Sequence, residues 1–430
     1  MNLNGTKKAP PANVVLPHYA FAAISFFVLC VLIFLASSSF LGHYFDPRLL
    51  SITHLAALGW ISMIIFGALY QLIPVILLAE LFSNSLARIT FFLFAVSLVL
   101  FGFCFWNFYL GWPFILSASL LLLSILFFTV NVYFTGRRSA NQEIAADFIL
   151  AGSCWLLVTA VLGLLMSINL THPFLSAEHL TYLKLHAHTG FGGWILMIIM
   201  GVGSKLIPMF MLSSGGETKD LRIAFYFINS ALLGFFTDVL FSHSFNRGII
   251  YFLIALISVI FLMKFIVQTY KKRARKKLDL GLKQTISAIM LLLLPVCIGT
   301  LVNIGVYKGT SFHLNLSTAY VTSILIGFVS LMIIGQTYKT LPFIVWLHKF
   351  GALAGKEKTP LPKDLYNESI ANAHFLIFMV AYPIFLSGIL LSQLLLLKIG
   401  SGLLILVALL YNINVFRIIS YPVIKKNHHE

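Results

Sequence analysis

The feature that most limits how this chain can fold is a series of long apolar runs. Segments of about 20 or more predominantly apolar residues recur along all 430 residues, and only 10% of the residues are charged. A helix of about 20 apolar residues crosses the roughly 30 Å hydrocarbon core of a bilayer, whereas soluble domains carry about 25% charge. The pattern predicts an all-α polytopic membrane protein in a lipid bilayer, with no soluble domain.

Twelve membrane-spanning helices are predicted from these runs. They lie near residues 18–38, 53–78, 89–109, 113–134, 147–169, 186–211, 222–241, 248–270, 284–305, 318–346, 372–394 and 399–421.

The chain has a formal net charge of +16, and the distribution of its basic residues indicates membrane topology. With the N-terminus on the inner side, the 29 Lys and Arg residues lie inside except for Arg48, Lys184, Arg247, Lys308 and Lys398. This asymmetry follows the positive-inside rule and predicts a bacterial inner-membrane protein with both termini in the cytoplasm. The basic run 271–277 is then a cytoplasmic loop that fixes topology beside anionic lipid, and nucleic acid is not an expected partner.

The four cysteines each lie alone within an apolar run, at positions 30, 104, 154 and 297. No CxxC pair occurs, so the sequence predicts neither a disulfide framework nor a thiolate metal site. We expect all four to be small, buried apolar residues.

A repeat relates three parts of the chain. The segment that starts at His54 matches the segment that starts at His188, 134 residues later, and the same offset again reaches residue 322. Glycines and prolines coincide at this offset, in the sets Gly67, Gly201, Gly335 and Pro74, Pro208, Pro342. The repeat predicts one membrane domain over 1–430, made of three parallel four-helix repeats (about 14–138, 146–277 and 283–426) with pseudo-threefold symmetry.

Histidine is present in only two of the three copies. His54 and His188 match each other, whereas the third copy has Thr322 at that place and Tyr320 in place of His186. A purely architectural histidine would be expected in all three. Because a neutral imidazole ligates haem iron and copper, we predict that His54 and His188 are ligands, although a lone membrane histidine can also simply hydrogen-bond a neighbouring helix.

The expected orientation of these histidines follows from a regular helix of about 100° per residue. The stripe of small residues lies opposite His54, so it is assigned to helix packing, and His54 points away from it. His186 lies about 200° around the helix from His188, so the two should face different neighbours, and His186 is a candidate ligand for a second haem or metal. Lys205 and Lys339, near the inner helix ends, are expected to snorkel to the membrane surface.

Two segments, HLAALGWISMIIFGALYQLIPV and HAHTGFGGWILMIIMGVGSKLIPMF, carry a resemblance. In a chain of twelve spans they resemble subunit I of the haem–copper oxidase superfamily, which includes nitric oxide reductases. They are also similar to haem- and copper-containing membrane proteins of the nitric oxide response. The resemblance covers nearly the whole chain as architecture and is specific around 54–76 and 186–210.

The resemblance implies a haem b between the second and sixth helices, with His54 and His188 as axial ligands of the iron. The chain departs from the family in two ways. The family's HxH pair lies on the tenth helix, whereas here it lies on the sixth. The copper ligands are also incomplete, since only His243, a candidate metal ligand, falls in the region where the family has an adjacent histidine pair.

The predicted function is therefore a haem-binding membrane protein of oxidase-like fold. It would act in respiratory electron transfer or in O2 or NO metabolism, with a redox partner or other respiratory subunits, and would be an oxidoreductase if it is catalytic. No catalytic residue is identified. Two alternatives stay open: a protein that handles or transports copper or another metal with histidines on the outer side, such as His43, His172 and His179, and a scaffold subunit without cofactors.

Overall fold

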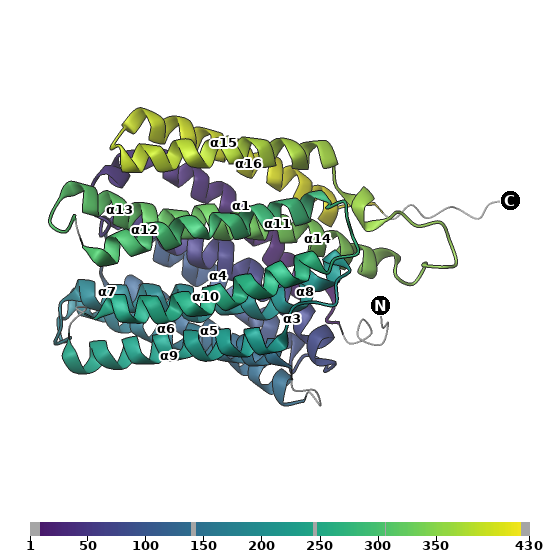
Figure 1. The fold of residues 1–430 in the computed structure, drawn as a ribbon, viewed down its shortest axis with the longest axis horizontal. Helices are drawn as coiled ribbons and strands as arrows, with labels where there is room; N and C mark the ends of the chain where they lie inside the picture. Colours follow the sequence, from purple (N-terminus) through teal and green to yellow (C-terminus); the bar gives the residue numbers. More distant parts are fainter. Residues whose placement is uncertain (1–8, 139–142, 244–246, 306, 423–430) are drawn as a thin grey trace. The chain divides into compact units, whose positions relative to one another are not determined.

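The computed structural model describes residues 9–138, 143–243, 247–305 and 307–422 (Figure 1). Within these ranges, twelve helices are long and apolar enough to cross a membrane, which confirms the predicted number. Helical elements are α1 (Ala12–Leu35), η2 (Ser37–Leu41), α2 (Pro47–His54), η3 (Leu55–Ser62), α3 (Met63–Leu77), α4 (Asn84–Trp106), α5 (Trp112–Arg137), α6 (Ile144–Thr171), α7 (His179–His188), η4 (Thr189–Leu196), α8 (Met197–Met211), α9 (Thr218–Ser242), α10 (Gly248–Lys271), α11 (Leu280–Leu291), α12 (Leu293–Ile304), α13 (Ser311–Thr322), η5 (Ser323–Val329), α14 (Ser330–Phe350), η6 (Pro362–Leu365), α15 (Glu368–Leu390) and α16 (Leu394–Ile419).

The chain divides into two compact units. Among the described residues, unit 1 contains those of 9–10, 69–278 and 299–305, and unit 2 contains 11–68, 279–298 and 307–422. The second predicted repeat falls wholly in unit 1, while the first and third repeats are cut by the unit boundaries. The prediction of a single domain over 1–430 stays a prediction, and positions 423–426 of the third repeat lie outside the described residues.

Many spans begin several residues before the predicted apolar run, because a polar residue caps the helix there. The Asp46 carboxylate accepts hydrogen bonds from two backbone N–H groups at the start of α2, and Pro47 occupies the first helical position. Ser83, Thr310 and Asn367 cap α4, α13 and α15 in the same way. Capping satisfies N–H groups that a helix start leaves open, so the helices extend beyond their apolar lengths.

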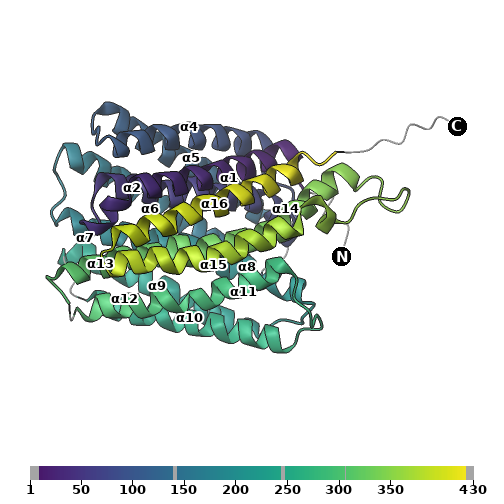
Figure 2. The ribbon, with the colours of Figure 1, turned by 90° about the horizontal axis from the view of Figure 1, so that it is seen from above.

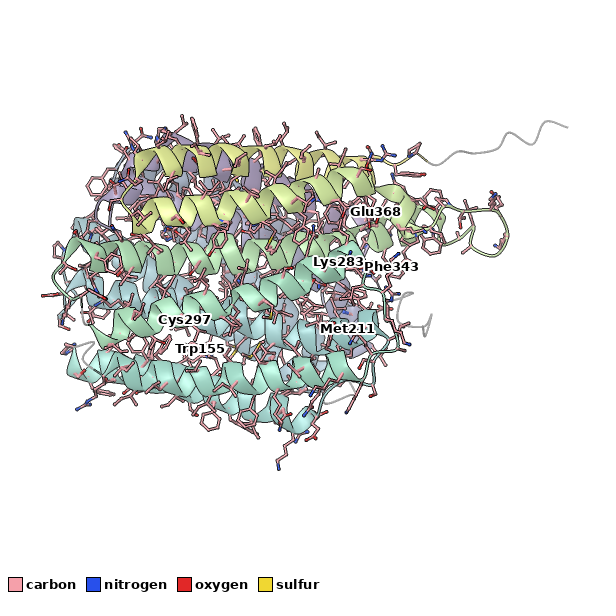
Figure 3. All side chains as sticks on the ribbon, turned by 45° about the horizontal axis from the view of Figure 1, so that its top comes forward. Trp155, Met211, Lys283, Cys297, Phe343 and Glu368 are labelled. Carbon is pink, nitrogen blue, oxygen red and sulfur yellow. The ribbon has the colours of Figure 1, made fainter. Side chains whose placement is uncertain are left out.

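The helix flanks are largely hydrocarbon (Figure 3). On α4 the exposed side chains Phe92, Val96, Val99 and Phe103 follow a spacing of four, three and four residues, which is one face of a helix. The buried side chains Phe94, Leu98, Phe101 and Phe105 form the opposite face. In Figure 3, Lys283 and Glu368 lie near helix ends, whereas Trp155 and Cys297 lie along the helices. An exposed apolar face of this length is suited to lipid.

The predicted packing role of the glycine stripe is confirmed. A Cβ built on Gly67 would lie 2.6 Å from the Cβ of His18 on α1. A Cβ on Gly201 would lie 2.7 Å from the Cβ of Phe148 on α6, and one on Gly335 would lie 2.8 Å from the carbonyl oxygen of Gly281 on α11. In each case the absent side chain lets the preceding span approach closely.

Each of the three matched helices contains a π-helical segment. These segments are η3, η4 and η5, and they begin directly after His54, His188 and Thr322. Their starts, at residues 55, 189 and 323, are separated by the same 134 residues as the sequence repeat. The regular 100° wheel used above was therefore wrong for residues beyond His54, because a π segment has i→i+5 hydrogen bonds and more residues per turn.

Trp60 is the centre of the packing in unit 2. It is fully buried in η3, stacks on Phe26 of α1 with ring centroids 4.5 Å apart, and meets Tyr411 of α16 edge-on at 5.4 Å. Its indole N–H donates to the Ser330 hydroxyl of α14 at 2.9 Å. Figures 1 and 2 both show α15 and α16 side by side in this unit. The π segment of the second span is thus joined to three other helices.

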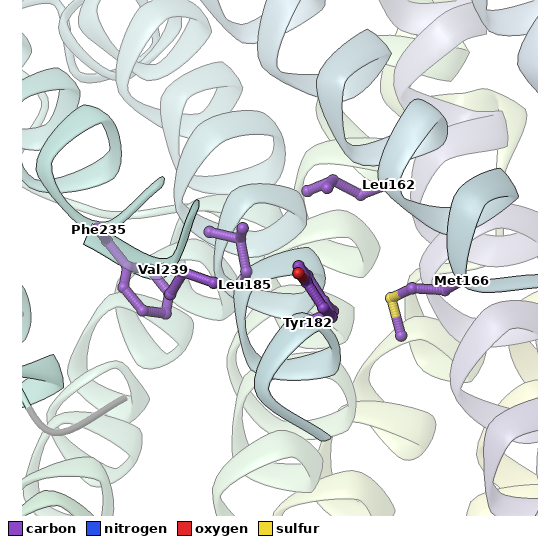
Figure 4. Close-up of a cluster of buried hydrophobic side chains, with 6 residues drawn as sticks. All are labelled: Leu162, Met166, Tyr182, Leu185, Phe235 and Val239. Carbon is purple, nitrogen blue, oxygen red and sulfur yellow. The ribbon is translucent and has the colours of Figure 1, made fainter. Parts of the chain in front are cut away.

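In unit 1 the short helix α7 is held by a buried apolar cluster (Figure 4). Tyr182 and Leu185 of α7 lie between side chains of α6 and side chains of α9; the cluster is Leu162, Met166, Tyr182, Leu185, Phe235 and Val239. Because Leu185 is fully buried, the neighbouring positions 186 and 188 have fixed directions. The cluster therefore orients both histidines of the HxH pair.

The expectation that all four cysteines are buried was wrong for two of them. Cys30 and Cys104 are buried, but Cys154 and Cys297 are exposed on helix flanks. A thiol behaves as a small apolar group, so an exposed flank within an apolar span accommodates it as well as the core does. All four are free cysteines, in agreement with the prediction of no disulfide framework.

Candidate functional site

His54 and His188 end two equivalent helices and have the same anchorage. His54 is the last residue of α2 and His188 is the last residue of α7. The Nδ1 of His54 lies 2.7 Å from the carbonyl oxygen of Leu50, and the Nδ1 of His188 lies 2.7 Å from the carbonyl oxygen of Lys184. Both rings are partly buried. The match at the repeat offset therefore extends from residue identity to side-chain geometry.

This anchorage determines where the proton of each neutral ring lies. A carbonyl oxygen only accepts, so Nδ1 of each ring must be the donor. The lone pair of the neutral imidazole is then on Nε2, on the far side of the ring from its own helix backbone. Histidines that bind metals in proteins commonly donate their other ring N–H to a carbonyl in this way, which fixes the tautomer and the ring direction. The donor chemistry of His54 and His188 thus fits a haem iron or another metal that prefers imidazole.

His186 and His188 face different neighbours, as predicted. The Nδ1 of His186 lies 3.0 Å from the carbonyl oxygen of Thr159 on α6, and a Cβ on Gly163 of α6 would lie 3.0 Å from the His186 ring. The His188 ring instead meets Phe235 of α9 edge-on, with centroids 5.7 Å apart. Both histidines precede η4, so the regular helical angle holds between them. The contacts of His186 are those of a residue that ties α7 to α6.

The four predicted site residues do not fall in one unit. His54 belongs to unit 2, whereas His186, His188 and His243 belong to unit 1. His243 is exposed at the C-terminal end of α9, where it has a left-handed backbone conformation and its Nδ1 lies 3.3 Å from the Ser176 hydroxyl. It is eight residues past Phe235, the contact of His188, which is about 12 Å along a helix. Its weak assignment as a metal ligand stays a prediction.

Among the described residues, no group of three or more His, Cys, Asp or Glu side chains is arranged to hold a metal ion. An axially ligated haem needs only one or two protein ligands to its iron, so the histidine anchorage described above is the relevant feature. Among the residues that the structure describes, no further copper ligands were found beside the histidines named from the sequence.

Lys205 and Lys339 have partners that the sequence did not predict. Lys205 forms an ion pair of 2.8 Å with Glu143, which directly precedes α6, and Lys339 forms one of 2.6 Å with Asp279, which directly precedes α11. Each lysine is thus paired with the start of the preceding span rather than only reaching the membrane surface. The pair occurs in the second and third copies, whereas the first copy has Gln71 at the place of the lysine.

Sequence reasoning also missed a buried polar network in unit 2. The Tyr338 hydroxyl lies 2.7 Å from Nε2 of His374 and accepts from the Asn414 amide at 3.2 Å. All three side chains are buried. Outside the spans, burial raises the pKa of Tyr366, whose ring lies 4.9 Å from that of Tyr338, to about 12. The available signal was His374, an ionisable residue within an apolar span, because such residues are rare in membranes and are functional-site candidates by default.

A scan against protein-family models and a search of curated proteins each found no match to this sequence.

Proposed function

We propose that this chain is a haem-binding integral membrane protein of the oxidase-subunit-I type, with His54 and His188 as ligands of haem iron. The observation that carries the proposal is their common anchorage: each donates Nδ1–H to the carbonyl four residues earlier, at 2.7 Å, directly before a π segment. π segments within helices occur frequently at functional sites. The third copy keeps the π segment but has Thr322, so the imidazole serves something other than the helix geometry.

In this function the protein holds the haem and adjusts the strength of its iron ligands. The carbonyls of Leu50 and Lys184 fix the tautomer and the direction of each ring, and a hydrogen-bonded imidazole is a stronger ligand. When bound, haem supplies one-electron transfer and the binding of diatomic gases. The role that we propose is respiratory electron transfer or O2 or NO metabolism, with a redox partner or further respiratory subunits. Copper is outside the proposal.

We also propose the finer architecture, three parallel four-helix repeats with pseudo-threefold symmetry. Two features support it at the sequence offset in all three copies: the π segments and the close-packed glycines. An even number of spans in each repeat gives parallel copies. We also propose a location in a bacterial inner membrane, and the excess of Lys and Arg on one side supports cytoplasmic termini; residues 1–8 and 423–430 lie outside the described residues.

The test is an optical spectrum of the purified full-length protein, with iron and copper measured on the same sample. We expect a Soret band and an iron content that matches it. His54→Ala and His188→Ala should each lose or shift the band. Thr322→Ala is the matched control, because it changes the equivalent position of the third copy and should leave the band unchanged.

A protein that stays colourless after reconstitution with haem would overturn the proposal. Bound copper without porphyrin would favour the metal-handling alternative. A sample that contains neither iron nor copper would favour the scaffold alternative. If neither histidine variant affects the Soret band, the protein binds haem but its iron ligands are other residues.

A further inference from the structure

The loop between α10 and α11 carries the densest positive charge of the described chain. Six of the seven residues 271–277 are Lys or Arg, and we call this the basic segment. It begins at Lys271, the last residue of the membrane span α10, and lies in unit 1. Topology requires positive charge on this side of a membrane, but it does not require that the charges have a fixed arrangement.

The backbone of the basic segment is held in place. The N–H groups of Ala274 and Arg275 donate to the carbonyl oxygens of Leu212 and Met211, at 3.1 Å and 3.3 Å. The Lys272 ammonium donates to the carbonyl of Gly215 at 3.3 Å. Two consecutive residues thus pair with two consecutive residues at the end of α8. The segment is a built surface rather than a loose tail.

The cations have two distinct roles. The Arg273 guanidinium lies 3.6 Å from the centroid of the Tyr270 ring and donates to the Tyr270 carbonyl at 2.8 Å, so it belongs to the scaffold. Lys271, Lys276 and Lys277 are exposed. The carboxylates of this unit that form ion pairs do so with other cations: Glu143 with Lys205, Asp238 with Arg247, and Asp220 with Lys264. Two acidic residues lie near the segment: Glu217, exposed on the loop before α9, and Asp279, two residues after Lys277, which forms an ion pair with Lys339.

Exposed apolar side chains directly adjoin these cations. Leu212, whose carbonyl accepts from Ala274, is 60% exposed, and Met209 one turn earlier is 44% exposed. Val267, one turn before the end of α10, is 46% exposed. A soluble phosphate or an RNA would use the charges but not the apolar side chains. A phospholipid uses both, because its headgroup phosphate is joined through glycerol to acyl chains.

We propose that the basic segment is a binding site for the headgroup of an anionic phospholipid, whose acyl chains lie along Leu212 and the flank of α10. The site is independent of the proposed haem ligands. Charge near a membrane surface contributes about a fivefold change in affinity for each Lys or Arg. Removal of three exposed cations should therefore weaken binding about a hundredfold.

The experiment is native mass spectrometry of the full-length protein in a neutral detergent, titrated with phosphatidylglycerol or with phosphatidylcholine. We expect phosphatidylglycerol to bind more tightly, and the triple variant Lys271→Gln, Lys276→Gln, Lys277→Gln to lose about a hundredfold in affinity. The variant with Arg at these three positions should keep the affinity, which separates lost binding from misfolding. Short RNA and glycerol phosphate are added as competitors and should not displace the lipid.

A matched control removes the same charge from another loop. Lys356, Lys358 and Lys363 are exposed between α14 and α15, in a loop that Figure 1 shows extending beyond the ends of the helices. Their change to Gln should alter phosphatidylglycerol binding less than about threefold. Equal losses in the two triple variants, equal binding of the two lipids, or displacement by RNA or glycerol phosphate would each overturn the proposal.

Discussion

Gly201 and Gly203 offer a direct test of close packing, because they lie two residues apart on the same helix and differ in their surroundings. A Cβ on Gly201 would lie 2.7 Å from the Cβ of Phe148 and 3.1 Å from the carbonyl oxygen of Ala145, both on α6. A Cβ on Gly203 would meet only Ile207 of its own helix, at 3.4 Å. The change to Ala is chemically the same in the two places.

The difference between the two variants can be worked out from these distances. Carbon atoms pack best about 3.5–4.0 Å apart, so Gly201→Ala places two carbons about 1 Å too close, and neither can rotate away because each is a Cβ. Overpacking of this kind costs about 1–3 kcal/mol. Ala is favoured over Gly within a helix by about 0.5–1 kcal/mol, and this gain is common to both variants. We therefore expect Gly201→Ala to be less stable than Gly203→Ala by about 1–3 kcal/mol.

The free energy of unfolding would be measured for both variants by reversible unfolding in mixed micelles. Gly203→Ala should be as stable as the parent protein or slightly more so. If Gly201→Ala matches Gly203→Ala, α6 and α8 are not in the close contact that the structure shows, and the packing role of the stripe would be wrong. Gly67→Ala and Gly335→Ala, with obstructions at 2.6 Å and 2.8 Å, should follow Gly201→Ala.

Substitutions at three further positions test individual hydrogen bonds. Asp46→Ala removes the cap of α2 and should lower the free energy of unfolding by about 1 kcal/mol, whereas Asp46→Asn should keep most of it. Ser330→Ala leaves the buried indole N–H of Trp60 without its acceptor and should cost about 1–3 kcal/mol, with a shift in tryptophan fluorescence as a second measurement. His186→Ala loses the bond to the carbonyl of Thr159 and should destabilise the protein while a Soret band persists; loss of that band would add His186 to the ligands.

The span pattern was predictable because each helix must be apolar over a length set by the bilayer. All twelve predicted spans correspond to helices of the structure. Their starts were less predictable, since the cap at Asp46 lies outside the apolar run. The close contacts of Gly67, Gly201 and Gly335 also followed from sequence, because a small residue at the same place in three copies points to one packing rule.

Three features needed coordinates. The π segments have no signature in composition, and their effect on the helical wheel beyond His54 followed only from the hydrogen bonds. The pair Lys339 and Asp279 joins residues 60 positions apart, which a helical period does not link. The network of Tyr338 and His374 joins two different spans, so each residue alone resembled an isolated polar side chain.

The third copy separates architecture from chemistry. If the imidazole were needed to start a π segment, η5 would require one, yet it begins after Thr322 with no histidine. If the imidazole were needed for packing, the contact at Gly335 would be absent or looser, yet a Cβ there would be obstructed at 2.8 Å, as in the other copies. The scaffold is therefore complete without the ring. What His54 and His188 add, and Thr322 does not, is a nitrogen donor held in one tautomer, and that is the property on which the haem proposal depends.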